Sequence, residues 1–159
     1  DRVGGVAVRV AREMEERVVE HFAVNGKVER EPRLWCKVGG DGKFSGCIDR
    51  LEIDGTRASI IDYKMLYGRY QPAKLNKQLQ VYSVLVFDNY PDVETCYLGL
   101  IQPMLGESTT ASVSRHDAME LKKFLVKLTD RITSEDPKRQ PGAEQCKWCS
   151  ALALSPIHI

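Results

Sequence analysis

Two short segments, residues 46–53 and 59–64, constrain what this chain can fold into more than any other part of it. Both are rich in Ile, and the second also contains Tyr63, a composition that favours strands. The pair Asp54-Gly55 closes the first segment and favours a turn. We therefore expect two strands joined by a turn, with the rest of the chain arranged around them.

Each of these expected strands carries a carboxylate. Because side chains alternate along a strand, Asp62 and Lys64 should project from the same face of the second one. On the first strand, Asp49 falls in a mostly apolar row that includes Leu51 and Ile53. A carboxylate in such a row is costly unless it is paired or binds a metal.

The two carboxylates and the lysine suit one kind of chemistry. Carboxylates at neighbouring strand ends can hold a divalent cation through hard oxygen ligands. A lysine on the same face can position a water or stabilise negative charge as it develops. The pattern predicts metal-assisted hydrolysis of a phosphodiester. Taken singly, a strand-end carboxylate for Asp49 and a surface ion pair for Asp62 and Lys64 remain alternatives.

Three motifs, in this order, resemble the PD-(D/E)xK nuclease superfamily, and most closely its RecB-like, CRISPR-associated-type phage exonuclease branch. They are Gly46-Cys47-Ile48-Asp49, Asp62-Tyr63-Lys64 and Gln78-Leu79-Gln80-Val81-Tyr82. The resemblance implies that Asp49 and Asp62 bind Mg²⁺ or Mn²⁺, with the carbonyl of Tyr63 as a further ligand. It also implies that Lys64 orients the attacking water, and that Gln78 and Tyr82 hold this lysine and the strand to be cut.

The expected fold is α/β: a mixed central sheet flanked by helices, a restriction-endonuclease-like core of order αβββαβ with a C-terminal helix. Apolar periodicity places helices at about 6–22, 73–89 and 115–134, and strands at about 27–38, 94–103 and 108–114. Leu75, Leu79, Tyr82 and Val86 are the expected buried stripe of the middle helix, and Met119, Phe124, Leu125, Leu128 and Ile132 that of the last. We expect a nuclease-like domain over 1–135 and a tail over 136–159.

The first helix offers a candidate for a third metal ligand. The RecB-like branch tends to have Gly-x-x-x-His here, but at that spacing after Gly5 the chain has Arg9. We take Glu13, one turn further on, as the substitute, with Glu16 as the alternative. A solvated charged face is the competing interpretation for either residue.

The segment after the site lysine carries three cations, Arg69, Lys74 and Lys77, and two tyrosines, Tyr67 and Tyr70. Cations neutralise backbone phosphates, and tyrosines stack on bases. We predict that this segment binds DNA, either single-stranded or at duplex ends. A solvated loop with packing tyrosines is the alternative.

The tail contains Cys146 and Cys149 at Cys-x-x-Cys spacing, which suits a zinc or iron–sulfur site. Iron–sulfur nucleases of this superfamily carry a further cysteine downstream and one upstream of the first helix. Here Ser155 holds the downstream place, and the sequence has no cysteine upstream of Gly4. We expect no intact iron–sulfur cluster in this chain, and one only in a longer or different form of it. The start without Met is consistent with an upstream segment.

Composition and charge further limit the kind of protein that this chain can be. The 159 residues suit one domain, and a net charge of +1 means that any nucleic-acid site must be a local patch. No run is apolar enough to span a membrane, and no signal peptide is visible. Five scattered cysteines argue against a disulfide framework, so we expect a cytoplasmic protein of a bacterial or phage-infected cell, or one associated with the nucleoid. Cys36, Cys47 and Cys96 are expected to be small buried groups.

These features together predict a metal-dependent deoxyribonuclease, and the motifs favour an exonuclease over an endonuclease. Phage recombination or DNA repair would be a fitting setting. Two alternatives stay open. One is a catalytically impaired nuclease-fold module that binds nucleic acid or a replication or recombination partner. Arg9 in place of the expected His supports this alternative. The other is a restriction-type endonuclease.

Overall fold

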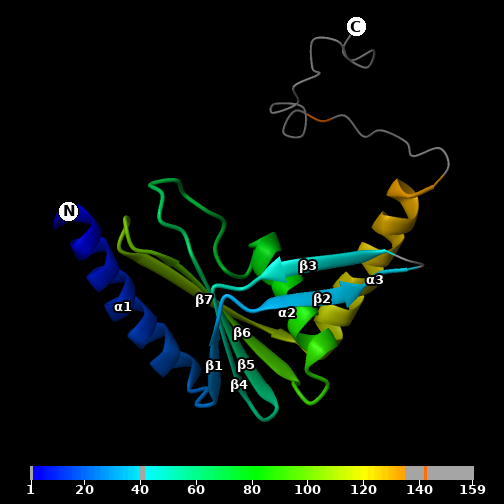
Figure 1. Cartoon of the computed structure of the whole chain (residues 1–159), viewed down its shortest axis with the longest axis horizontal. Helices are drawn as coiled ribbons and strands as arrows, with labels where there is room; N and C mark the ends of the chain where they lie inside the picture. The colour runs from blue at the N-terminus through cyan, green and yellow to red at the C-terminus, as the bar shows by residue number, and fades with distance from the viewer. Residues whose placement is uncertain (1, 40–41, 135–141, 143–159) are drawn as a thin grey trace, which may run out of the picture.

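The computed structural model describes residues 2–39, 42–134 and 142. In chain order the elements are α1 (Arg2–Phe22), β1 (Lys27–Arg30), β2 (Arg33–Lys37), β3 (Lys43–Cys47), β4 (Arg50–Asp54), β5 (Arg57–Tyr63), α2 (Lys77–Asn89), β6 (Thr95–Gln102), β7 (Glu107–Ser114) and α3 (Arg115–Ile132). Five strands form a mixed sheet in the order β1-β4-β5-β6-β7, in which only β5 and β6 are parallel. Helices flank this sheet (Figure 1), which confirms the expected α/β class.

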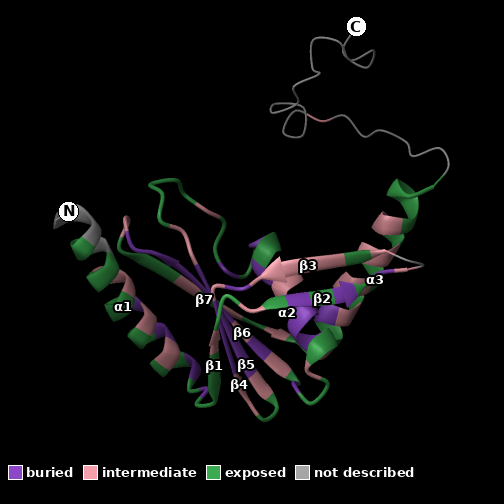
Figure 2. Cartoon of the chain, in the orientation of Figure 1, coloured by how far each residue is buried: buried purple, intermediate pink, exposed green. Residues whose placement is uncertain are grey.

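Alternation along β5 divides the interior into two cores on opposite faces of the sheet. Ile60 belongs to the larger core, which α2 and Ala118 of α3 complete. Ile61 packs with Val18 and other apolar residues of α1 in the smaller one. The two helical layers therefore lie on opposite faces, and the most buried residues line the sheet between them (Figure 2).

Two of the expected strands are each broken into two. The single strand expected over 27–38 stops at Glu31, which has a positive φ of 52°, and at Pro32, which has no N–H to donate. β1 joins the main sheet, whereas β2 leaves it and pairs with β3 in a separate two-stranded ribbon. The strand expected over 46–53 breaks at Ile48 and Asp49, so Asp49 lies in the connection between β3 and β4 and not in an apolar row.

The β4–β5 turn confirms the turn expected at Asp54-Gly55. Asp54 pairs with Arg57 across the hairpin, and Gly55 has a φ of +56°, a left-handed conformation that glycine adopts without strain. Between β2 and β3, the carbonyl of Gly39 accepts from the N–H of Gly42 (2.8 Å).

The helices agree with expectation in place and differ in detail. α2 starts only at Lys77, because the side chain of Asn76 caps it by accepting from the Leu79 N–H at 3.1 Å. Leu75 therefore precedes the helix and is exposed, whereas Leu79 and Val86 are buried as expected. Ser114 caps α3, because its side chain accepts from the N–H of Asp117. The expected buried stripe of α3 is partly wrong, since two of its members are exposed: Phe124 and Ile132. Within the described residues, every helix is too short or too polar to span a bilayer.

Candidate active site

Asp62 and Lys64 lie at the end of β5, the middle strand of the sheet. Asp62 is 2% exposed, and Nζ of Lys64 lies 2.8 Å from its Oδ2. The backbone N–H of Lys64 donates to the carbonyl of Ile101 (2.9 Å), so pairing with β6 fixes the chain beyond the last residue of the strand. Asp62 and Lys64 therefore project to the same face, as their spacing predicts.

Asp49 reaches this site from the connection between β3 and β4. Its Oδ2 accepts from the backbone N–H of Tyr63 at 2.8 Å, and its own carbonyl accepts from the N–H of Glu31 at 3.2 Å. The ladder between β4 and β5 ends at the Arg50–Ile61 pair, so the carboxylate takes the place of a missing strand partner. The structure thus brings Asp49 and Asp62 to one strand end.

The carboxyl group of Asp62 has a raised pKa. Burial is the main cause, the charge of Asp49 adds to it, and the contact with Lys64 acts in the opposite direction. The buried Oδ2 of Asp62 forms an ion pair with the Lys64 ammonium at 2.8 Å and has no further hydrogen-bond donor within the described residues. Negative charge at this point therefore exceeds what the surrounding side chains compensate.

A chain of side chains holds the lysine in place. Nζ of Lys64 donates to Oε1 of Gln78 at 2.8 Å, and Nε2 of Gln78 donates to the hydroxyl of Tyr82 at 2.7 Å. The ring of Tyr82 packs on the backbone of Gly46, where a Cβ would come within 2.6 Å of its Cε1. All three motifs of the sequence therefore meet here, and the glycine is required because the ring approaches so closely.

The segment after Lys64 is pinned to the sheet at two points. Gln102 donates to the carbonyl of Gly68 (3.0 Å), and Thr109 accepts from the N–H of Ala73 (2.9 Å). The ring centroid of Tyr70 lies 5.7 Å from the ammonium of Lys64, a cation–π distance. Sequence reasoning gave Tyr70 no part in holding the lysine.

The cations of this segment lie beside the site and face solvent. Arg69, Lys74 and Lys77 are all exposed, and Lys77 donates to Gln80 at 3.1 Å. Tyr67 is 71% exposed. The predicted roles of these residues in DNA binding stay predictions.

On the opposite face, the α1 acid that contacts the sheet is Glu15. Glu13, Glu16 and Arg9 are exposed, whereas Glu15 accepts from the hydroxyl of Tyr63 at 2.6 Å. Glu15 also forms an ion pair with Arg50 at 2.9 Å. Sequence reasoning missed this residue, although its position one turn before the half-buried Val19 places it on the sheet-facing side of α1.

The three cysteines in the described part of the chain were all expected to be buried. Cys36 and Cys96 are buried as expected, whereas Cys47 is half-buried and its Sγ lies 3.2 Å from the carbonyl of Glu31. Burial raises the pKa of the Cys36 thiol to about 11, and Asp88 adds to the effect, so this thiol is protonated at neutral pH. The predicted pair Cys146 and Cys149 lies outside the described residues.

The donor set at the strand end fits a hard divalent cation. Magnesium is typically held by one or two carboxylates, with waters and substrate phosphates completing its shell. Asp49 and Asp62 supply two carboxylates, and Oδ2 of Asp62, with no further hydrogen-bond donor among the described residues, is an oxygen that a cation would satisfy. In the described part of the chain no cluster of three or more acids, histidines or cysteines forms a larger shell.

Comparisons with known proteins agree with this geometry. The crystal structure of SSO0001 has a TM-score of 0.50 to this chain at 18% sequence identity, over 94% of this chain and 68% of that one, a likeness of fold alone. No curated protein sequence matches the chain. The family model described as the PD-(D/E)XK nuclease superfamily matches residues 3–154. Nucleases of this superfamily act on nucleic acids and generally use divalent metals such as Mg²⁺. With its motifs brought together at one strand end and a match over nearly its whole length, the chain belongs to the PD-(D/E)XK nuclease superfamily.

Proposed function

We propose that this protein is a DNA exonuclease that depends on Mg²⁺ or Mn²⁺. The observation that carries the proposal is the convergence of Asp49, Asp62 and Lys64 at the end of β5, with the lysine held by Gln78. Hydrolysis adds water across one P–O bond: the water oxygen attacks phosphorus, and the leaving oxygen takes up a proton. The preference for exonuclease action rests on the resemblance of the three motifs to the RecB-like branch.

Asp49, Asp62 and the carbonyl of Tyr63 would hold the metal. Once bound, it would polarise the phosphate and lower the pKa of a coordinated water. Glu13 remains the predicted further ligand from α1. Glu15 is a weaker candidate, because Tyr63 and two arginines already occupy its carboxylate.

The chain's own groups would do the positioning. Lys64 donates through an ammonium that its contacts with Asp62 and Gln78 aim at the strand end, so it would orient the attacking water or stabilise developing charge. Gln78 and Tyr82 would hold that ammonium and the bound strand in place. Arg69, Lys74 and Lys77 would contact the phosphates of the DNA that enters the site.

The test is cleavage of end-labelled linear DNA, single-stranded and duplex, beside a covalently closed circle of the same sequence. We expect degradation of linear DNA with Mg²⁺ or Mn²⁺, none in excess EDTA, and an intact circle. Robust cutting in EDTA would contradict the metal mechanism. Cutting of the circle would instead support the restriction-type endonuclease. DNA binding without any cleavage would support the impaired module.

A further inference from the structure

The ribbon formed by β2 and β3 has an outer face that the proposed active site does not use. Alternation buries Leu34 and Cys36 beneath the ribbon and leaves Arg33, Trp35 and Lys37 exposed. Trp35 is 56% exposed, an unusual position for so large an apolar side chain. The outer face thus presents one indole between two cations.

Within the described residues, no carboxylate pairs with the cations on this face. Lys37 lies directly opposite Lys43 across the ribbon, and like charges in that position destabilise a β-ladder. Neither lysine forms an ion pair in the described part of the chain, and Arg33 donates only to the hydroxyl of Ser45 (3.1 Å). Because Lys37 and Lys43 repel each other, an anionic ligand that contacts both lysines would stabilise the ribbon.

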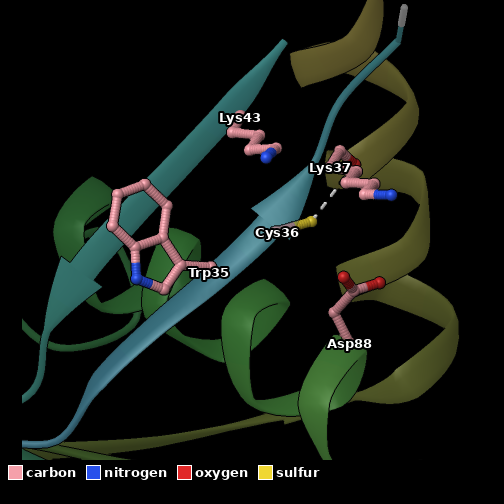
Figure 3. A pocket seen from close by; sticks show the side chains of 5 residues that line it. All are labelled: Trp35, Cys36, Lys37, Lys43 and Asp88. Carbon is pink, nitrogen blue, oxygen red and sulfur yellow. Dashed lines mark hydrogen bonds between the residues drawn. The ribbon is translucent and has the colours of Figure 1, made fainter. Parts of the chain in front are cut away.

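A groove of about 510 Å³ runs beside the ribbon, a size within the roughly 300–1,000 Å³ range of ligand pockets. It is lined by Trp35, Cys36, Lys37, Lys43 and Asp88. Figure 3 shows the indole and the two lysines spaced along it. Asp88, the one carboxylate among the described lining residues, is paired with Lys122 and not with either of the two lysines.

The ribbon leads directly to the candidate site. β3 ends at Cys47, and Asp49 follows two residues later. The carbonyl of Pro32 accepts from the N–H of Ile48 (3.1 Å), which ties the start of β2 to the same point. At ~3.3 Å per residue, Lys43 lies about 20 Å of chain from the carboxylate, a distance that several nucleotides of a strand would span.

We propose that the outer face of the β2–β3 ribbon binds the single-stranded segment of the nucleic acid whose end occupies the active site. A base would stack on Trp35, while Arg33, Lys37 and Lys43 would contact phosphates on either side of it. A single strand fits better than a duplex, because only an unpaired base can turn its flat face to the indole. The proposal rests on the proposed nuclease function for the direction in which the strand runs.

Fluorescence of Trp35 gives a direct test. The chain has two tryptophans, so a Trp148→Phe background leaves Trp35 as its sole indole. In EDTA, which keeps the DNA uncut, we expect a single-stranded oligonucleotide to quench this emission and a blunt duplex to do so far less. Trp35→Ala should weaken single-strand binding by roughly 5- to 100-fold, as expected for one lost stacking contact, and Trp35→Phe should keep most of it.

The lysines need a matched control. Replacing Lys37 and Lys43 by Ala should reduce the slope of log affinity against log salt by about 0.7 for each lost phosphate contact on a single strand. Replacing Lys27 and Lys123, exposed lysines that are paired with Glu29 and Glu120, should leave the slope unchanged.

The outcomes separate this proposal from the proposed function. Absence of quenching, together with wild-type affinity of Trp35→Ala, would overturn the ribbon proposal even in an active nuclease. Quenching by single strands in a protein that cuts no DNA would leave the ribbon proposal standing and overturn the nuclease proposal. In an active enzyme, Trp35→Ala should raise KM for long single strands and leave kcat unchanged.

Discussion

Two polar clusters meet at the end of β5, on opposite faces of the sheet, and their electrostatics differ. The α1-side cluster consists of Glu15, Arg30, Arg50, Glu52 and Tyr63. The α2-side cluster consists of Asp49, Asp62, Lys64, Gln78 and Tyr82. Consecutive residues of one strand, 62 and 63, belong to different clusters, so local sequence alone does not explain the difference.

The α1-side cluster is balanced. Its two acids face two arginines, and Arg50 lies 2.8 Å from Glu52 as well as beside Glu15. Burial alone would raise the pKa of Glu15, but its hydrogen bonds with Tyr63 and Arg30 and the charges of both arginines outweigh burial and lower it. The charges of such a cluster compensate one another, although Nε and Nη1 of Arg50 form no hydrogen bond within the described residues.

The α2-side cluster is unbalanced. Two carboxylates face one lysine, and the pKa of Asp62 is raised where that of Glu15 is lowered. The comparison teaches that the charges of one cluster compensate one another, whereas the other keeps a negative charge that a further cation would compensate. Perturbed carboxylates of this kind gather at functional sites.

The largest effect should follow removal of the lysine. We expect Lys64→Ala to lower the single-turnover rate of DNA cleavage by roughly 100-fold or more, because a preorganised positive group is lost next to developing charge. Calorimetry should show that Mg²⁺ or Mn²⁺ still binds, since the proposed ligands are the carboxylates. Lys123→Ala, at an exposed and paired position, is the control. Cutting by Lys64→Ala at the wild-type rate would refute the assigned role.

Removing an acid of the α1-side cluster should lower the free energy of unfolding as well as any catalytic rate. Glu15→Ala removes one of the two acids paired with the buried Arg50 and the acceptor of the Tyr63 hydroxyl, so we expect the free energy of unfolding in urea to fall by about 2–3 kcal/mol. The exposed acids Glu13 and Glu16 are matched controls, and their Ala variants should lie within about 0.5 kcal/mol of wild type. If Glu13→Ala folds normally but binds metal more weakly, the predicted α1 ligand is supported.

The unbalanced cluster should behave in the opposite way. In EDTA we expect Asp62→Asn to raise Tm by a few degrees, at about 2–4 °C per kcal/mol for a domain of this size, because it removes a buried charge near Asp49. Mg²⁺ should raise the Tm of wild type and leave the variant unchanged. A lower Tm for Asp62→Asn in EDTA would show that Lys64 already compensates the charge.

The same comparison predicts the pH dependence of the metal-free protein. Because the folded-state pKa of Asp62 is raised above its ordinary value of 3.8, the folded protein holds more protons than the unfolded chain between the two values. This residue therefore makes the free energy of unfolding fall as pH rises from about 3.8 through the raised pKa. Urea titrations at a series of pH values should show that Asp62→Asn lacks this component.

The smallest effect should come from the cations around the α2-side cluster. Replacing Arg69, Lys74 and Lys77 by Ala should weaken DNA binding a few-fold and reduce the log–log salt slope by about one unit or less per lost phosphate contact. Binding measured by anisotropy across a salt series gives this slope. A slope equal to that of wild type would make this segment an ordinary solvated loop.

The sequence predicted which side chains share a face at the end of β5, but not the structure around them. Asp62, Lys64, Gln78 and Tyr82 were predictable because each lies within one element, where a fixed period decides which side chains share a face. The break at Asp49 was not, because it follows from the departure of β2 into a separate ribbon, which only tertiary packing decides. Period-based reasoning could not foresee it.

Glu15 shows the same limit on the other face. Three acids lie within four residues of α1, and which of them turns inward depends on where the helix docks on the sheet. The sequence offers Glu13 and Glu16 as readily as Glu15. Its partners Arg30 and Arg50 come from strands distant in the chain, so their pairing carries no local signal.

The missing side chain of Gly46 has a mechanical consequence. The ring of Tyr82 rests on that bare backbone, and through Gln78 it sets where the Lys64 ammonium stands. A methyl group at position 46 would clash with the ring and displace it, and the Lys64 ammonium would move with it. The substitution would do so without replacing any residue that contacts substrate in the proposed mechanism. A screen that scores only charge or size at the reaction centre would overlook this position, although the tolerance there is a fraction of an ångström.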